Sequence, residues 1–438
     1  MTPDPKAFPS GIVLDVSRLV SRIGGGALTG IDRVEAEWLA HLTGPDAPCP
    51  VLLLCRITGA QALLPATTGA AILRWAAGDL SDLPRHPGWR DRLARRNTPR
   101  HRAMAALRRT ALRLLPRSGQ GIARAIELLL GCDRARVAYL NLGHSNLSAR
   151  LLDHLSGSRR VVMIHDTIPL DHPEFTRAGQ SDRFAGRLRA ALGGADLILA
   201  ISDATAQRIL HWQAQFRITH RPELLRIPIG TRLATPDPAA IPADLHLPRP
   251  FFIALGTIEP RKNHALLLDV WDRLAASLPA DRLPHLLIIG RRGWENRAVF
   301  ARLDTLGPQD AVLERADLSD GAVAALLDRC HGLLMPSLAE GFGLPLTEAA
   351  GRGVPVMATP LPSTFEMLGE YASYLPPDDA DAWATQIIAS AGQRPQRFPP
   401  LAIWSWPRHF ARVAEALGAH DRAAADPGGP AGGDDQWR

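Results

Sequence analysis

Cysteine is scarce in this chain of 438 residues, and its spacing fits neither of the usual arrangements. No two cysteines form a C-x-x-C pair, so the sequence predicts neither a zinc site nor a disulfide framework. We therefore expect the protein to reside in a reducing compartment. The four cysteines are Cys49, Cys55, Cys132 and Cys330.

Long hydrophobic runs are missing as well. No uninterrupted apolar stretch approaches the ~20 residues that a membrane-spanning helix requires. The first residues, MTPDPKAFPSG, lack the basic region and apolar run of a secretory signal. These absences predict a cytoplasmic protein. Hydrophobic residues make up 46% of the chain and charged residues 21%, which is the balance of an ordinary globular protein.

Acidic residues are nearly absent from one segment. Between Arg85 and Arg124 the chain carries twelve arginines and one acid, Asp91, a local charge of +11, and the remainder carries about −5. Three interpretations stay open: a solvated helical face, which is the default, docking to an anionic membrane surface, or nucleic-acid binding. The single aromatic, Trp89, disfavours the last, and we expect no nucleic-acid partner. The apolar residues Met104, Leu107, Ala111 and Leu114 are three or four positions apart, which predicts a helix in this segment.

Short apolar strands alternate with helical stretches over most of the chain. This alternation predicts βαβ units and parallel sheets, and a proline-rich stretch near the middle predicts a linker between two doubly wound domains. The cleft between the domains would lie at the carboxyl ends of the strands. We divide the chain into a first domain (10–235) with an arginine-rich helical insert (about 83–131), a linker (236–250), a second domain (251–400), a final helix (401–417) and a disordered tail (418–438).

The strongest motif is S-L-A-E-G-F-G-L-P-L-T-E-A-A-G-R-G-V-P, residues 337–355. A strand leads into it, and we expect a helix over Leu346 to Gly351. Glu340 and Glu348 stand eight residues apart around a glycine turn. Glycine lets backbone N–H groups approach an anion at a helix N-terminus, whereas carboxylates accept hydrogen bonds from hydroxyls. A nucleotide-sugar carries both kinds of group.

The second motif is G-T-I-E-P-R-K-N, residues 256–263, directly after a predicted strand. Arg261 supplies a planar fork and Lys262 a compact charge, a pair that suits a departing diphosphate. A solvated basic turn is the alternative interpretation of the same two residues.

The first domain offers weaker candidates at its own strand ends. A glycine loop over Gly24 to Arg33 suits close approach to a phosphate, although a plain turn into a helix would look the same. His165 and Asp166 end one strand, and His144 follows another; a structural histidine is the alternative for both. Ser202 with Asp203 is better explained as a helix N-cap. The loop candidates are Gly25, Gly26, Thr29 and Gly30.

Together these motifs resemble the family 4 retaining glycosyltransferases of the GT-B fold, also called glycosyl transferases group 1. The resemblance rests on E-G-F-G-L-P-L-T-E-A, on G-T-I-E-P-R-K-N and on the variant loop T-G-I-D-R-V-E. It covers Gly11 to Leu417 apart from the arginine-rich segment. It implies two Rossmann-like domains facing a cleft, with the last helix crossing back to brace the first domain.

The reaction implied by the resemblance is transfer of a sugar from a GDP- or UDP-linked donor to a hydroxyl of a saccharide or lipid-linked acceptor, with retention, in polysaccharide biosynthesis. Mannose is one candidate sugar. In that scheme Arg261 and Lys262 neutralise the departing diphosphate, Glu348 binds the ribose, and Glu340 and His165 contact the sugar. The resemblance also places Gly341, Phe342, Gly343 and Leu344 at the donor, and Gly25, Gly26, Thr29 and Gly30 on the acceptor side.

A metal-dependent transferase of the other major fold would need a D-x-D motif after a strand. The one candidate, Asp379-Ala-Asp381, precedes a predicted helix and is better explained as its cap. We expect no metal and no other cofactor. Two alternatives to the transferase remain: an epimerase or hydrolase of the same architecture, and a non-catalytic nucleotide-sugar-binding scaffold. A lipid-linked acceptor would place the protein peripherally on the inner face of a membrane.

Overall fold

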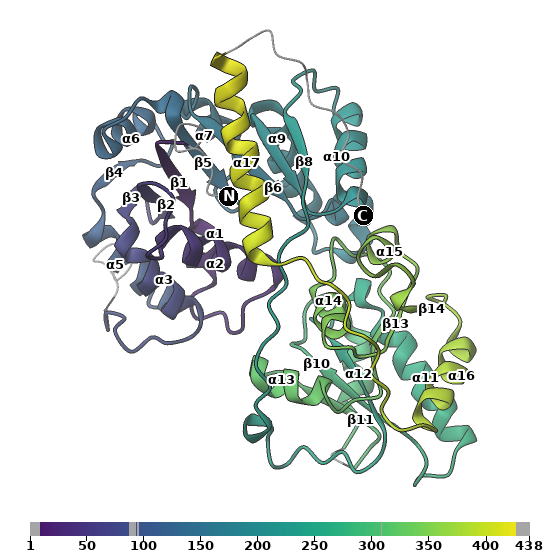
Figure 1. Ribbon diagram of the computed structural model, residues 1–438. Coiled ribbons are helices and arrows are strands. Elements are labelled where there is room, and N and C mark those ends of the chain that lie inside the picture. Colours follow the sequence, from purple (N-terminus) through teal and green to yellow (C-terminus); the bar gives the residue numbers. More distant parts are fainter. Residues whose placement is uncertain (1–8, 87–92, 94–95, 308, 426–438) are drawn as a thin grey trace.

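Two α/β domains, each built on its own sheet, make up the protein (Figure 1). The computed structural model describes residues 9–86, 93, 96–307 and 309–425. The first domain is drawn in purple to teal and the second mainly in green. The expected class of two Rossmann-like domains is confirmed.

The first domain contains an eight-stranded sheet in the order β4-β3-β2-β1-β5-β6-β7-β8. Its elements are β1 (Gly11–Asp15), α1 (Ser17–Arg22), α2 (Gly30–Thr43), β2 (Val51–Ile57), β3 (Ala60–Pro65), α3 (Gly69–Ala76), α5 (Pro99–Thr110), β4 (Arg113–Pro116), α6 (Ile122–Leu130), β5 (Val137–Asn141), α7 (Ala149–His154), β6 (Arg159–Ile164), α8 (Ile168–Asp171), α9 (Gln180–Gly194), β7 (Leu197–Ala200), α10 (Asp203–Gln215) and β8 (Glu223–Arg226).

The second domain contains a six-stranded parallel sheet in the order β11-β10-β9-β12-β13-β14. Its elements are β9 (Phe251–Leu255), α11 (His264–Ser277), β10 (His285–Ile289), α12 (Arg297–Asp304), β11 (Val312–Arg315), α13 (Asp320–Leu327), β12 (Gly332–Met335), α14 (Leu344–Gly351), β13 (Val356–Ala358), α15 (Pro362–Leu368), β14 (Ser373–Tyr374) and α16 (Ala380–Ala391), followed by α17 (Trp406–Ala425).

The central strands of both sheets are buried on both faces. Strands β1, β5, β9 and β10 are apolar apart from Asp15, Asn141 and His285 at their ends, as expected of parallel strands covered by helices on each side. Each sheet has a hydrophobic cluster on either face. Because the central strands run parallel, their carboxyl ends gather at one edge of each sheet, and the loops that follow them carry the motifs.

The arginine-rich segment is only partly the helical insert that the sequence predicts. Helices α5 and α6 lie within it, but β4 lies between them and pairs antiparallel with β3 at the edge of the first sheet. Leu114 is therefore on a strand and 41% exposed, not on a helical face. An open sheet edge supplies backbone hydrogen bonds that outweigh the local helical spacing. Residues 87–92 and 94–95 of this segment lie outside the described residues.

Helix α17 crosses from the second domain to the first, as expected (Figure 1). Its predicted bounds were wrong: it begins at Trp406, after Ser405 and with Pro407 in its first turn, and it ends at Ala425. The predicted tail from Gly418 is thus helical up to Ala425, and its remainder, 426–438, lies outside the described residues.

One histidine fixes this helix to the first domain. Trp38 Nε1 donates to His409 Nε2 at 3.2 Å, so that nitrogen accepts and the proton is on Nδ1, which donates to the carbonyl of Pro228 at 2.8 Å. Burial lowers the pKa of His409 to about 4, which keeps the ring in this neutral form. The ring of Phe410 stacks on His41 with centroids 3.9 Å apart.

Among the described residues, no helix is both long enough and apolar enough to span a membrane.

The contact between α2 and α17 predicts a large loss of stability on truncation. Trp38 is 3% exposed, so Trp38→Ala leaves a cavity and removes the partner of His409. We expect a loss of about 3–5 kcal/mol in the free energy of unfolding, measured by urea denaturation followed by circular dichroism. Leu128→Ala, at a side chain that is 67% exposed, should change it by less than about 0.5 kcal/mol. Equal effects of the two variants would show that α17 does not brace the first domain.

Candidate active site

The loop that follows β12 carries the strongest motif of the sequence. Gly343, with φ of +86°, caps α14 in a left-handed conformation that favours glycine. The helix begins at Leu344, two residues earlier than predicted, because Pro345 fits its first turn. Glu348 is therefore in the second turn of α14 and Glu340 is on the loop before it.

Glu340 is the acceptor at the centre of a buried ion cluster. Its Oε1 accepts from Lys262 Nζ at 2.5 Å and from Ser337 Oγ at 2.7 Å, and its Oε2 accepts from Arg261 Nη1 at 2.9 Å. Arg261 also donates from Nε to Glu259 at 2.6 Å. Burial acts to raise the pKa of Glu340, but the charges of Lys262 and Arg261 outweigh it and lower this pKa to about 2. The carboxylate is ionised at neutral pH.

The two basic residues owe their position to the turn after β9. Residues Pro260–Lys262 form a short 3-10 turn, and Asn263 follows in a left-handed conformation before α11 begins. The carbonyl of Arg261 accepts from the backbone N–H of Leu338 at 2.7 Å, which ties this turn to the loop after β12. Neighbouring parallel strands β9 and β12 thus bring the two motifs together.

Gly341 is where the second domain meets the first. A Cβ at this position would stand 2.4 Å from the carbonyl oxygen of His165 and 3.0 Å from Cβ of Asp166, so only glycine fits. The carbonyl of Gly341 also accepts from Ser202 Oγ at 3.1 Å. The structure therefore brings Glu340, His165 and Asp166 together across the domain boundary. Phe342 is buried next to this contact, in the core of the first domain.

The two candidate histidines hold their protons on the same nitrogen. His165 Nε2 donates to the carbonyl of Leu142 at 2.7 Å, and His144 Nε2 donates to that of Met163 at 2.5 Å. Burial lowers the pKa of His165 to about 4 and that of His144 to about 3, so both rings are neutral. Nδ1 of His165 is left with a lone pair that can accept from a hydroxyl.

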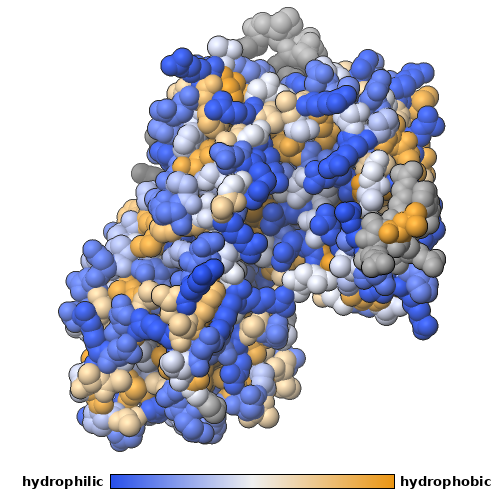
Figure 2. Space-filling model, turned by 180° about the vertical axis from the view of Figure 1, so that it is seen from behind, coloured by the Kyte–Doolittle hydropathy of each residue, from blue (hydrophilic) through white to orange (hydrophobic). Residues whose placement is uncertain are grey.

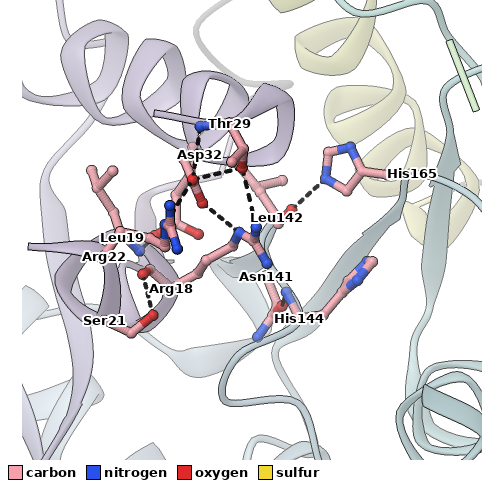
Figure 3. A network of polar contacts seen from close by, with 11 residues as sticks. Arg18, Leu19, Ser21, Arg22, Thr29, Asp32, Asn141, Leu142, His144 and His165 are labelled. Atoms are coloured by element: carbon pink, nitrogen blue, oxygen red, sulfur yellow. Dashed lines mark hydrogen bonds and ion pairs between the residues drawn. The ribbon is translucent and has the colours of Figure 1, made fainter. Parts of the chain in front are cut away.

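The glycine loop of the first domain is held by one carboxylate, that of Asp32 (Figure 3). Thr29 and Asp32 form a capping box at the start of α2, and Asp32 also accepts from Arg18 Nε at 2.7 Å and Arg22 Nε at 3.1 Å. Helix α1, which the sequence did not reveal, carries both arginines. Gly26 is in a left-handed conformation, with φ of +84°.

The second domain reaches this loop as well. Arg291 Nη1 donates to the carbonyl of Gly25 at 2.9 Å, and its guanidinium occupies the space that a Cβ on Gly26 would need. A Cβ on Gly30 would lie 3.7 Å from the side chain of Leu344, so the start of α14 faces the loop. The predicted acceptor-side glycines therefore face Arg291 and Leu344 of the second domain.

Glu348 faces the first domain through Arg33. Arg33 Nη1 lies 3.8 Å from Glu348 Oε1, and its Nη2 lies 2.6 Å from Asp320 Oδ1. Burial raises the pKa of Glu348 to about 7, since Arg33 offsets it only in part. Glu348 does not join the ion cluster of Glu340; the structure places it beside α2.

Glu35 is a buried acid of a different kind. Its Oε1 accepts from the backbone N–H of Leu19 at 2.9 Å, while Oε2 has no hydrogen-bond partner within the described part of the chain. A Cβ on Gly143 would stand 2.1 Å from that oxygen. Burial, together with the charges of Asp15 and Asp32, raises the pKa of Glu35 to about 8, so this carboxyl is protonated at neutral pH.

Two further candidates have structural roles. Ser202 Oγ accepts from the backbone N–H of Thr205 at 3.0 Å and caps α10, as predicted. Asp379 accepts from the backbone N–H of Ala382 at 2.9 Å and caps α16, as predicted. Within the residues that the structure describes, no group of three or more His, Cys, Asp or Glu side chains could hold a metal ion.

The boundary between the domains is recessed on one side of the molecule. The space-filling view shows the surface hollowed where the domains meet, with mainly hydrophilic side chains on both sides (Figure 2). Polar contacts also cross the boundary elsewhere: Glu366 of α15 accepts from the backbone N–H of Asp203 at 2.7 Å, and Trp294 Nε1 donates to the carbonyl of Phe175 at 2.9 Å.

Sequence reasoning assigned no role to Glu259, Arg33 or Glu35, although each stands inside a motif. One compositional signal was also overlooked. The chain has two lysines, Lys6 and Lys262, against 48 arginines. One of these two lysines, Lys262, is buried and contacts Glu340.

Two Rossmann-like domains that meet at their strand ends, with a C-terminal helix returning to the first, define the GT-B fold of glycosyltransferases. Within that class, residues 249–391 match the family model described as Glycosyl transferases group 1, and the second domain belongs to this family.

Curated relatives match part of the chain. It is 29% identical over 232 residues to a serotype-specific mannosyltransferase WbdA of Escherichia coli, covering 50% of this chain and 28% of that protein. It is 27% identical over 235 residues to the O-antigen chain mannosyltransferase B of Escherichia coli, covering 53% and 61%. The chain thus spans about a quarter of the first relative's length.

A solved structure matches over almost the whole chain. HepE of Anabaena, in complex with UDP-glucose, aligns with 95% of this chain and 99% of its own, at a TM-score of 0.55 and 14% identity. At this identity the match shows the fold alone, and it confirms the two-domain arrangement.

The raised pKa of Glu35 predicts a pH-dependent stability. When a carboxyl has a higher pKa in the folded state than in the unfolded state, the protein loses stability as the pH rises between the two values. For Glu35 these values are near 4.5 in the unfolded state and about 8 in the folded state. Glu35→Gln keeps the shape without the charge. Between pH 5 and pH 8 we expect the wild type to lose on the order of a few kcal/mol more unfolding free energy than this variant, measured by urea denaturation.

Glu37→Gln, on the same helix, is the matched control and should keep the pH dependence of the wild type. Parallel curves for Glu35→Gln and the wild type would mean that Glu35 is ionised in the folded protein.

Proposed function

We propose that this protein is a retaining glycosyltransferase, which moves a sugar from a nucleotide diphosphate sugar to a hydroxyl of a saccharide or glycolipid acceptor. The observation that carries the proposal is the placement of Glu340. It pairs with Lys262 and Arg261 of the second domain. The next residue, Gly341, packs against the backbone of His165 of the first domain, so the ion cluster stands at the domain boundary.

Each group has a role that its chemistry suits. Arg261 and Lys262 neutralise the diphosphate as it leaves, with the amides of Gly343 and Leu344 at the start of α14. For this step the two cations exchange part of their contact with Glu340 for phosphate oxygens. Because they are already fixed and largely shielded from water, little reorganisation is needed during the reaction.

The remaining groups orient the donor. Glu340 accepts from hydroxyls of the transferred sugar, and Nδ1 of His165 accepts from the same sugar across the boundary. Glu348 accepts from the ribose hydroxyls, which requires it to ionise in the complex and to exchange its contact with Arg33. The glycine loop, with Gly25, Gly26, Thr29 and Gly30, faces the acceptor side.

The names of the relatives support a finer proposal. Both aligned Escherichia coli proteins are mannosyltransferases, and one is an O-antigen chain enzyme, so we propose mannose as the sugar, from a GDP- or UDP-linked donor, and polysaccharide biosynthesis as the process. We assign donor binding to residues 251–400 and acceptor binding to 10–235, with 236–250 as linker. We place the reaction in the cytoplasm, at the inner face of a membrane when the acceptor is lipid-linked.

Ligand-induced stabilisation tests donor binding. We expect one of GDP, UDP, ADP and dTDP, at ~100 times its dissociation constant, to add about 2.7 kcal/mol to the folded state of the wild type, measured as a shift in thermal unfolding. Glu348→Ala should lose most of this shift because the ribose loses its acceptor. Glu370→Ala, at an exposed position, is the control and should behave as the wild type. No shift with any of the four would sink the proposal.

Replacement of Lys262 by arginine or alanine tests the transfer step. Lys262 is 8% exposed, and its ammonium contacts Glu340, so the larger guanidinium of Lys262→Arg does not fit. We expect kcat to fall by about 10²-fold for Lys262→Arg and by up to about 10³-fold for Lys262→Ala, with sugar transfer measured on the donor that the panel identifies.

An arginine-to-lysine substitution at an exposed residue is the control. Arg273→Lys, on α11, keeps the charge and should leave kcat unchanged. Sugar transfer at the wild-type rate by Lys262→Arg would contradict the role given to the ammonium. Release of free sugar in place of transfer would indicate a hydrolase.

A further inference from the structure

Arg187 of α9 is a half-buried cation without an acidic partner. Within the described residues its side chain makes no ion pair or hydrogen bond. One turn earlier on the same helix, the ring of Phe184 lies against that of His144, with centroids 6.1 Å apart. Arg187 is thus on the face of α9 that covers the turn after β5, close to the candidate site.

Arg18 flanks this turn from the other side. A Cβ on Gly143 would stand 2.6 Å from Cβ and 2.8 Å from Cδ of Arg18, so the arginine lies directly on the glycine. Arg56 is close to it, because its backbone N–H donates to Ser17 Oγ at 2.8 Å. Arginines of α1 and α9 therefore flank one turn at the carboxyl edge of the first sheet, and Arg56 of β2 stands beside α1.

The positive charge of this group is not neutralised by the acids near it. Asp32 pairs with Arg18 but is shared with Arg22, and Glu35 is protonated at neutral pH. Burial lowers the pKa of Arg187, and the charges of Arg56, Arg18 and Arg183 lower it further. A guanidinium that is partly desolvated next to like charges costs stability unless an anion binds there.

We propose that Arg18, Arg56 and Arg187 form an anion subsite on the first domain that binds a phosphoryl group of the acceptor. The inference rests on the proposed transferase function and deepens it, since it makes the acceptor a phosphate or diphosphate ester. Guanidinium groups bind phosphate oxygens in bidentate pairs, and several of them match a dianion better than a single carboxylate. These arginines belong to the first domain, whereas the donor cations Arg261 and Lys262 belong to the second.

Calorimetric titration of the full chain with inorganic pyrophosphate tests the subsite. We expect two binding events in the wild type, one at each set of cations. Arg187→Gln and Arg56→Gln, each as a single variant, should lower the affinity of the event at the first-domain arginines at least about tenfold. The affinity of the other event should stay unchanged. Arg189→Gln is the matched control: it is on the same helix, but its guanidinium stacks over Phe216, 3.7 Å from the ring centre. Wild-type binding by both variants, or an equal loss in the control, would overturn the subsite.

A donor-site variant separates this inference from the proposed function. Arg261→Gln should weaken only the other event. If Arg261→Gln abolishes all binding and Arg187→Gln none, the subsite is overturned while the donor site stands. If Arg187→Gln removes binding and Arg261→Gln changes nothing, the donor role fails while the subsite stands.

Two competitors distinguish the sources of the phosphate. Hexyl diphosphate and glucose 6-phosphate are each titrated against pyrophosphate bound at the subsite. If hexyl diphosphate displaces pyrophosphate at a lower concentration than glucose 6-phosphate does, the acceptor is lipid-linked. If glucose 6-phosphate displaces it at the lower concentration, the acceptor is a phosphorylated saccharide. Failure of both to displace it would overturn the assignment to an acceptor.

Discussion

The pairing of Glu340 with Lys262 and Arg261 is the interaction on which the boundary between the domains depends. It ties the loop after β12 to the turn after β9, and it fixes the loop that presents Gly341 to His165. Two cations and a carboxylate that are shielded from water are costly when apart and stable only as a set. The same shielding makes their charges effective toward a ligand, because the local dielectric is low.

The two domains contribute unlike groups to the boundary. The second domain brings cations and acids on loops that follow parallel strands, whereas the first brings neutral histidines, a glycine loop and arginines on α1 and α9. Helix α17 returns to the first domain through Trp38 and His409, so the chain crosses between the domains twice. Contacts such as Glu366 with the start of α10 complete this junction.

Helix α2 shows how position alone separates two acids of similar chemistry. Asp32 receives hydrogen bonds from two arginines and from Thr29, and it holds the glycine loop. Glu35, one turn later, receives one backbone hydrogen bond and forms no ion pair among the described residues, so burial decides its protonation. The result is a local excess of positive charge that the composition of the chain does not reveal.

The sequence by itself determined the central strands and the two strong motifs, because apolar runs and glycine act locally. The return of the last helix came from the family resemblance. The sequence could not determine that Arg113–Pro116 would pair as a strand, because the free edge of β3 is a distant partner. It could not show that Gly341 meets His165 or that Arg33 faces Glu348, since those contacts join residues more than a hundred positions apart. Which charges are paired, protonated or left open was decided only by the tertiary structure, because burial and distance set the pKa of a group.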